Sequence, residues 1–77
     1  MNKLDIFLEK YHQNILNSIN AKITEENLTQ KKLAALSKIS QPTLSKLLSG
    51  KSNFTLDQLA RISYALQIDI AEITSFK

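Results

Sequence analysis

Gly50 and Pro42 are the only glycine and the only proline in this chain of 77 residues. Tight hairpin turns depend on glycine and other turn residues, so such a chain has little capacity for β-hairpins. Apolar residues instead recur at steps of three and four, and no stretch alternates strictly between apolar and polar residues. The sequence therefore predicts an all-α fold in which Pro42 and Gly50 mark the two ends of one short helix.

The longest apolar stripe lies in the first third of the chain. It consists of Leu4, Phe7, Leu8, Tyr11, Ile15, Ile19 and Ile23. This spacing predicts one long helix over residues 3–23, or two helices that are nearly continuous. His12 falls near the edge of the stripe, so we expect it to be a surface or boundary residue with no role as a ligand.

Capping residues predict the two helices that follow. Thr29 suits the N-cap of a helix over residues 30–36, and Ser40 suits the N-cap of the next helix, in residues 40–49. Pro42 is tolerated in the first turn of that helix because amides there have no intrahelical partner. The single glycine suits the left-handed position that follows a helix.

Two capping boxes predict the last two helices. Thr55-x-x-Gln58 opens a helix that runs to about Leu66, and Asp69-x-x-Glu72 opens a short final helix. The prediction is thus a bundle of five helices that forms one domain over the whole chain.

Composition excludes several classes of site. The chain has no cysteine and one histidine, so it cannot form a disulfide or a metal site built on thiolates or histidines by itself. No apolar run approaches the ~20 residues of a membrane span, and the N-terminus does not resemble a signal peptide. Acids are scattered over the predicted helix surfaces, and no serine lies in a nucleophile setting. We therefore expect a cytoplasmic protein that is not an enzyme and uses no metal or cofactor.

The charges are unevenly distributed, although the net charge is only +3. Between Glu26 and Asp57 there is no acidic residue. The same segment contains Lys31, Lys32, Lys38, Lys46 and Lys51. A purely cationic segment is typical of a surface that faces phosphates, and a solvated lysine-rich face is equally consistent with charge alone.

The helices predicted at residues 29–36 and 40–49 have the spacing of a helix-turn-helix motif, because only three residues join them. Leu44 and Leu47 supply an apolar side that can face the first helix, and Ile39 suits a turn residue that points inward. The rest of the second helix is polar and short-chained with one long cation, which suits a helix lying in a major groove.

The stretch LTQKKLAALSKISQPTLSKLLSGKSNFTLDQLARISYALQIDIAEI, residues 28–73, resembles the lambda-repressor/Cro-type helix-turn-helix family, also called the Xre family. Leucine-threonine-glutamine opens the first helix of the motif, serine-glutamine opens the second, and a glycine closes it. The resemblance implies a lambda-repressor-like bundle of five helices that binds operator DNA, usually as a dimer.

The resemblance also implies a role for each exposed residue of the motif. The residues expected to read bases are Gln41, Pro42, Thr43, Ser45 and Lys46. Those expected to contact DNA phosphates are Thr29, Gln30, Lys31, Lys38, Ser49, Lys51 and Asn53. Those expected to form a dimer interface are Ile70, Ile73 and Phe76. Lys46 can serve a base or a phosphate, and for Lys31 and Lys32 a simple solvated face is an equal alternative.

The sequence departs from the family pattern in three places. Lys38 and Gln67 stand where the family commonly has glycine, and a non-glycine residue with positive φ costs roughly 1 kcal/mol. The N-terminal segment is longer than the family's first helix, so LDIFLEKYHQN has no role that the resemblance supplies. This amphipathic segment is a rival candidate for the dimer interface, or it covers the core.

The function expected from the sequence is sequence-specific binding of double-stranded operator DNA by a homodimeric regulator, a repressor, with no small-molecule ligand. The alternative is a protein-interaction module or an antitoxin that keeps the fold and binds a protein partner. The acid-free segment favours DNA, because a surface for a protein partner need not exclude carboxylates. The chain has no sensor domain, so it acts without an effector or is a fragment of a longer repressor.

Overall fold

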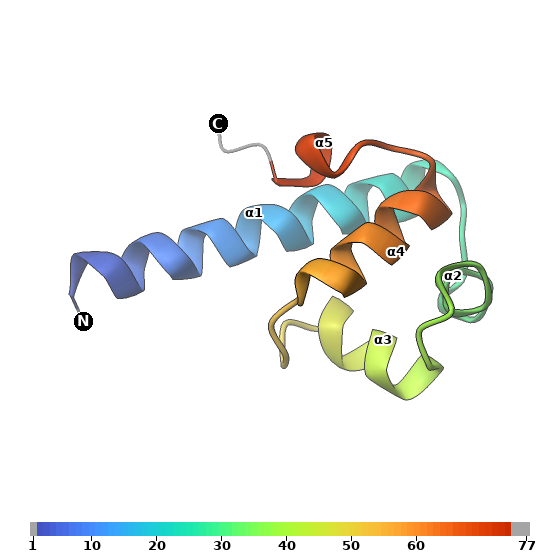
Figure 1. The fold of residues 1–77 in the computed structure, drawn as a ribbon, viewed down its shortest axis with the longest axis horizontal. Coiled ribbons are helices and arrows are strands. Elements are labelled where there is room, and N and C mark those ends of the chain that lie inside the picture. Colours follow the sequence, from blue (N-terminus) through green and yellow to red (C-terminus); the bar gives the residue numbers. More distant parts are fainter. Residues whose placement is uncertain (1, 75–77) are drawn as a thin grey trace.

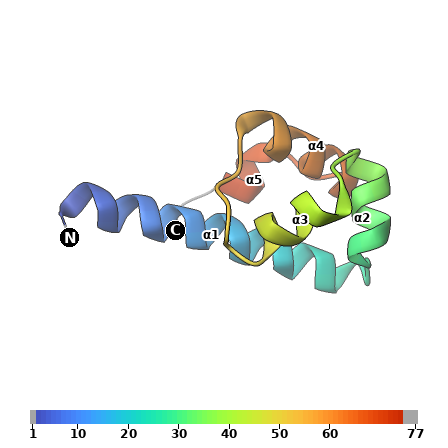
Figure 2. The same cartoon turned by 90° about the horizontal axis from the view of Figure 1, so that it is seen from below.

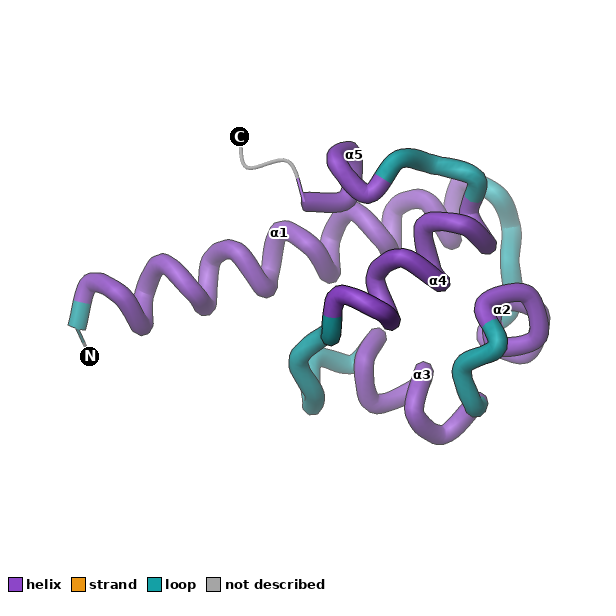
Figure 3. The backbone as a smooth tube through the Cα atoms, in the orientation of Figure 1, coloured by secondary structure: helices purple, strands orange, loops and turns teal. Residues whose placement is uncertain are grey.

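A computed structural model describes residues 2–74, in which helices follow one another without any strand. The helices are α1 (Lys3–Glu25), α2 (Gln30–Ser37), α3 (Gln41–Leu48), α4 (Leu56–Leu66) and α5 (Ile70–Thr74) (Figures 1 and 3). The predicted five-helix, lambda-repressor-like architecture with an extended N-terminal helix is confirmed. Of the two predictions for the first segment, the single long helix is right. None of these helices is long and apolar enough to cross a membrane.

The core lies where the four shorter helices meet the C-terminal half of α1 (Figure 1). Its most deeply buried side chains are Ile19, Leu33, Leu44, Leu47, Ile62 and Ile73. Every helix contributes at least one of them. Isolated helices shorter than about 12–15 residues are marginal in water. The four short helices are therefore held mainly by this shared burial, at roughly 1.5–3 kcal/mol for each large side chain.

The first turns of α1 extend beyond the other helices, as Figure 1 shows. Leu4, Phe7 and Leu8 are 62%, 51% and 54% exposed, whereas Leu16 and Ile19 of the same helix are buried. The apolar stripe predicted from the sequence therefore continues over two different environments, a solvent-exposed end and a core.

Most helix ends in the bundle are closed by residues in the left-handed conformation. Asn27, Lys38 and Gln67 have φ of 58°, 58° and 56°, and Gly50 has φ of 82°. Lys38 and Gln67 thus adopt the backbone that glycine favours, at a cost of roughly 1 kcal/mol each.

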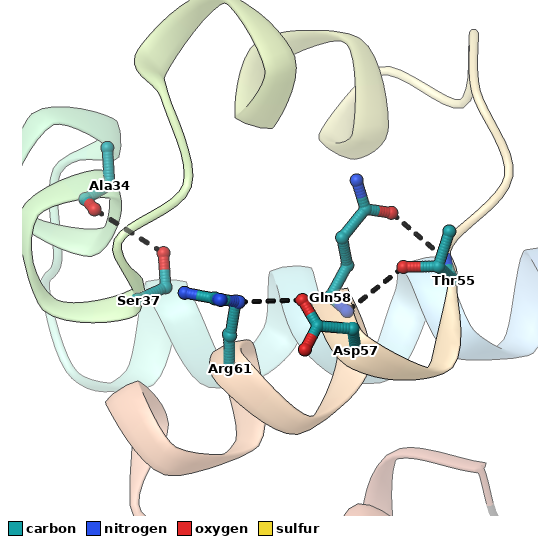
Figure 4. Close-up of polar contacts among 6 residues, drawn as sticks. All are labelled: Ala34, Ser37, Thr55, Asp57, Gln58 and Arg61. Carbon is teal, nitrogen blue, oxygen red and sulfur yellow. Dashed lines mark hydrogen bonds and ion pairs between the residues drawn. The ribbon is translucent and has the colours of Figure 1, made fainter.

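The capping box predicted at the start of α4 is present (Figure 4). The Thr55 amide donates to Gln58 Oε1 at 2.9 Å, and the Gln58 amide donates to Thr55 Oγ1 at 3.1 Å. At α5 the bond seen in the first turn joins backbone groups, with the Glu72 amide donating to the Asp69 carbonyl oxygen at 3.0 Å. The side-chain capping box predicted there is not found among residues 2–74.

The terminal helix is packed against α1 rather than presented to solvent. Ile73 is fully buried, and Ile70 is half-buried against the core. The Tyr11 hydroxyl donates to the carbonyl oxygen of Thr74 at 2.9 Å, which ties α5 to α1. The expectation that Ile73 faces a partner is therefore wrong for this packing, because its side chain is already part of the core. Phe76, the third residue of that predicted interface, lies outside the described residues.

His12 lies at the boundary of the bundle, as the sequence predicts. Its ring is half-buried and meets the ring of Phe54 edge-on, with centroids 6.0 Å apart and an interplanar angle of 76°. An edge-on arrangement at this separation is favourable between aromatic rings. His12 therefore helps to hold the loop before α4 against α1.

Candidate nucleic-acid interface

The turn between α2 and α3 is built by three consecutive residues with different conformations. Lys38 ends α2 in the left-handed region, with φ of 58° and ψ of 34°. Ile39 is buried in the core, as predicted, and Ser40 is extended and caps α3. The reversal at Lys38 and the anchor at Ile39 set the direction of α3 relative to α2, which gives the helix-turn-helix arrangement seen in Figure 1.

α3 has a buried side and an exposed side. Leu44 and Leu47 are completely buried beneath it. The five residues predicted to read bases are all exposed: Gln41, Pro42, Thr43, Ser45 and Lys46. Figure 1 shows α3 at the lower edge of the molecule, and in Figure 2, seen from below, it faces the viewer. The two leucines therefore anchor a helix whose polar side is open to a ligand as large as a duplex.

The first turn of α3 orients a hydroxyl group. Ser40 Oγ accepts from the Thr43 amide at 3.4 Å and donates to Thr43 Oγ1 at 2.8 Å. The Thr43 hydroxyl is therefore held by an acceptor contact, and its own proton remains available to donate. Pro42 lies in this turn, where the absence of an N–H removes no intrahelical bond. Sequence reasoning identified Ser40 as a cap but missed its contact with the Thr43 side chain.

The end of α3 leads directly into the predicted phosphate-binding loop. The Ser49 hydroxyl donates to the Lys46 carbonyl oxygen at 3.1 Å, and the Lys51 amide donates to the same oxygen at 3.0 Å. The side chains of Lys51 and Asn53 are exposed. In this conformation the Ser49 proton is directed to the backbone, so Lys51 and Asn53 are the side chains that this loop offers to solvent.

Glycine is favoured at position 50, at this end of α3, for two reasons. Its φ of 82° is unfavourable for other residues, and a Cβ atom placed there would lie 3.3 Å from Leu16 Cδ1. α1 thus supports the C-terminal end of α3 at Leu16. Sequence reasoning explained the first requirement, but the contact with α1 appears only in the fold.

The N-terminal end of α2 presents a second polar surface. The Lys32 amide donates to Thr29 Oγ1 at 3.1 Å, which caps the helix as predicted. Gln30, Lys31 and Lys32 are exposed around this end. The exposed amides and polar side chains at this end suit an anion.

The lysines of the acid-free segment have no carboxylate partner among residues 2–74. The ion pairs found there join Lys22 to Glu25 and Glu26, and Arg61 to Asp57 at 2.7 Å (Figure 4). The hydrogen bond to Glu26 raises the pKa of Lys22, so the charge of this lysine is offset by the two glutamates. The lysines around the motif instead keep their charge available for phosphates.

Together, the exposed side of α3 and the surrounding lysines form a surface with two kinds of chemistry. Amides and hydroxyls on α3 can exchange hydrogen bonds with base edges, and lysines on both sides can contact a phosphate backbone. An α-helix of this kind fits the width of a major groove.

Comparison with known protein families gives a match to the helix-turn-helix family HTH_3 over residues 19–73. No curated protein and no solved structure matches the chain. The match begins within α1 and ends within α5, so it spans the core and the motif and leaves out the exposed first turns. The chain therefore belongs to the lambda-repressor/Xre-type helix-turn-helix family of DNA-binding regulators.

Proposed function

We propose that the protein is a sequence-specific repressor that inserts α3 into the major groove of an operator and acts as a homodimer. The observation that carries this proposal is the exposed polar side of α3 above two fully buried leucines, Leu44 and Leu47. A helix anchored in this way presents its polar residues in a fixed register, which reading a sequence requires. Since it acts on operator DNA, we place it in the cytoplasm.

In this proposal one set of residues reads base edges and another set contacts the DNA phosphates. Gln41 pairs with adenine through N6 and N7, and Thr43 offers the donor left by its contact with Ser40. The residues that contact phosphates and position the duplex are Thr29, Gln30, Lys31, Lys38, Lys51 and Asn53. We assign Ser49 to the same DNA phosphate backbone. Pro42 and Ser45 line the reading face, and the Pro42 ring can pack on a thymine methyl group. Lys46 can belong to either set, because its ammonium group can contact a guanine or a phosphate.

Selection from a random duplex library tests this proposal directly. We expect enrichment of one short motif present twice as an inverted repeat, with half-sites about one helical turn, roughly 34 Å, apart. A library that returns no enriched sequence, while binding remains steeply salt-dependent, would show only non-specific attraction and would contradict the proposal.

An antitoxin or other protein-interaction module is the second candidate. The observation that favours it is an open groove of about 640 Å³ beside α2, α4 and α5, lined in part by the exposed side chains of Leu36 and Tyr64. Aromatic side chains are enriched where proteins bind one another. This candidate predicts that Tyr64→Ala impairs function in cells whereas Gln41→Ala does not, which is the reverse of the result expected for a repressor.

A further inference from the structure

The N-terminal extension, residues 3–18 of α1, precedes the segment that matches the helix-turn-helix family. The match begins at residue 19, and all the residues to which we assign a DNA contact lie beyond it. The extension is nevertheless partly covered, because Leu16 is buried and Ile15 packs against the core. The contacts of this half of α1 therefore indicate what it adds to the family fold.

The N-terminal extension contacts the α3–α4 loop, residues 49–55, at two points. At the start of the loop, a Cβ atom placed at Gly50 would lie 3.3 Å from Leu16 Cδ1, so the backbone there packs directly on the extension. Near the end of the loop, the ring of Phe54 meets the ring of His12 edge-on, with centroids 6.0 Å apart. Figure 2 shows the chain between α3 and α4 reaching α1.

The two contacts are compatible in their spacing along both segments. Leu16 and His12 are four residues apart on one face of α1, which separates them by about 6 Å along the helix. Gly50 and Phe54 are also four residues apart, and a chain of that length can span up to about 13 Å. The loop therefore lies along α1 without being stretched, and it runs in the opposite direction to the helix.

The loop and the N-terminal extension also border a common groove of about 240 Å³. Leu8 and Ile15 line it from the extension, and Phe54 lines it from the loop. Asn53 lines the same groove, although it is exposed to solvent. Since Leu8 and Ile15 are seven residues apart, the extension borders the loop over about two helical turns.

We propose that the N-terminal extension raises the affinity for DNA by holding the α3–α4 loop in place, with His12 and Phe54 as positioning residues. Lys51 and Asn53 lie between the two contacts, so a DNA backbone meets side chains on a loop that is already ordered. Ordering a loop during binding costs conformational entropy, and a loop ordered beforehand avoids this cost. The proposal rests on the proposed function, because the order of the loop matters only if Lys51 and Asn53 contact phosphates.

His12 acts in this proposal through packing. Its Nε2 atom is buried, and no hydrogen-bond partner for this atom is found among residues 2–74. A phenyl ring at the same position can therefore keep the edge-on contact with Phe54 without losing a hydrogen bond from that nitrogen. His12→Ala removes the ring, whereas His12→Phe keeps a ring and removes the imidazole.

Backbone order in the free protein tests the support of the loop directly. Nitrogen-15 relaxation should give order parameters of about 0.85 for Lys51 and Asn53 in the wild-type chain, and values that fall toward about 0.6 in His12→Ala. Gln13→Ala is the matched control, because Gln13 is exposed and bonds to Asn17 on the same helix. Gln13→Ala and His12→Phe should keep the wild-type values. Equal order of the loop in His12→Ala and the wild type would overturn the proposal.

DNA binding measures the consequence of losing this order. His12→Ala should bind the duplex selected from the random library roughly 3- to 10-fold more weakly than the wild type, the range expected when side chains must be ordered during binding. The loss should be equal across single-base variants of that duplex, because the loop is assigned to phosphates and not to base edges. His12→Phe and Gln13→Ala should bind like the wild type. A loss that changes the base preference would place the effect in α3 and overturn the proposal, as would an equal loss in His12→Phe.

A double-mutant cycle separates positioning of the loop from a general loss of stability. In a chain that already carries Lys51→Ala and Asn53→Ala, the order of the loop no longer affects those phosphate contacts. His12→Ala should then weaken binding by less than about 2-fold, which is the usual error of additivity. A variant that only destabilised the fold would weaken binding by the same factor in both backgrounds, and that result would overturn the proposal.

The same measurements separate failure of this inference from failure of the proposed function. Sequence-specific binding by the wild type that His12→Ala leaves unchanged would overturn the positioning role and leave the proposed function intact. A wild-type chain that binds all duplexes alike would overturn the proposed function. In that case a loss of affinity in His12→Ala, absent from Gln13→Ala, would still support the positioning of the loop.

Discussion

α3 and the first turns of α1 are both exposed helical surfaces, but only α3 is anchored from below by fully buried side chains. Leu44 and Leu47 are buried under α3, whereas Leu4 and Leu8 are themselves the exposed residues of α1. Polar side chains on α3 are well solvated without a partner. Apolar area on α1 that stays in water loses the free energy of burial, about 25 cal/mol per Å². The comparison indicates that exposure to water costs little for the polar side of α3 and more for the apolar side chains in the first turns of α1.

The largest expected effect comes from removing the anchor of α3. Leu44→Ala should lower the free energy of unfolding by about 2–5 kcal/mol, because a buried leucine loses its contacts and leaves a cavity. Since a domain of this size rarely has more than ~3–5 kcal/mol from its core, the variant should be largely unfolded at room temperature. Urea unfolding followed by circular dichroism measures the change.

The matched variant on the other surface is Leu4→Ala. Leu4 is 62% exposed, so its replacement should change the free energy of unfolding of the monomer by less than about 0.5 kcal/mol. If Leu44→Ala and Leu4→Ala lowered the free energy of unfolding equally, α3 and the first turns of α1 would not differ in the way that their burial indicates.

The next effect concerns reading by α3. Gln41→Ala should lose about 1–3 kcal/mol of discrimination at one base pair, because a bidentate contact with adenine is removed. Binding to a library of single-base operator variants measures this, and the preference should relax at one position in each half-site.

Lys51→Ala is the control for that reading role, because Lys51 lies just beyond α3 in the loop. It should weaken binding to all sequences alike and reduce the dependence of log K on log salt by about one unit of slope. A uniform loss of affinity in both variants would show that Gln41 is not a reading residue.

A smaller effect is expected at the start of α3. Ser40→Ala removes the cap of the Thr43 amide and the donor that holds the Thr43 hydroxyl. We expect a loss of about 1 kcal/mol in the free energy of unfolding, and a further change in sequence preference because Thr43 is released. Ser40→Asn should restore most of the stability, since asparagine is an equally good cap, without restoring the contact with Thr43. A variant that keeps the wild-type preference would argue against a positioning role for Ser40.

The smallest effect is expected in the turn. Lys38→Gly removes a side chain from a left-handed position and should stabilise the fold by a few tenths to about 1 kcal/mol, after the greater entropy of glycine is included. Thermal unfolding measures the gain, and Gln67→Gly should give a similar gain at the end of α4. If Lys38 contacts phosphate, only Lys38→Gly should also weaken DNA binding.

The helix ends could be predicted well because their causes are local. Thr55 and Gln58 are three residues apart, and their mutual bonds depend on nothing outside the turn. The left-handed conformations at Lys38 and Gln67 have no such local cause, because neither residue type favours a positive φ. The exposed side of α3 was predictable as well, since its period is that of a helix with one buried face.

Contacts between distant segments were not predictable. The bond from Tyr11 to Thr74 and the contact between Leu16 and Gly50 join residues far apart in the chain. No local pattern specifies which partner a side chain will meet. The position of Ile73 illustrates the consequence, because an apolar residue on a terminal helix suits a core and an interface equally well.

The sequence by itself determined the helices, their caps and the polar side of α3, because these depend on interactions within a few residues. The tertiary structure decided which part of the long apolar stripe is core. Ile19 and Leu4 have the same chemistry and fall in one periodic pattern, yet one is buried and the other is exposed. The physical reason is that burial depends on which other segments cover a helix, and within residues 2–74 the rest of the chain covers α1 only from about Tyr11 onward.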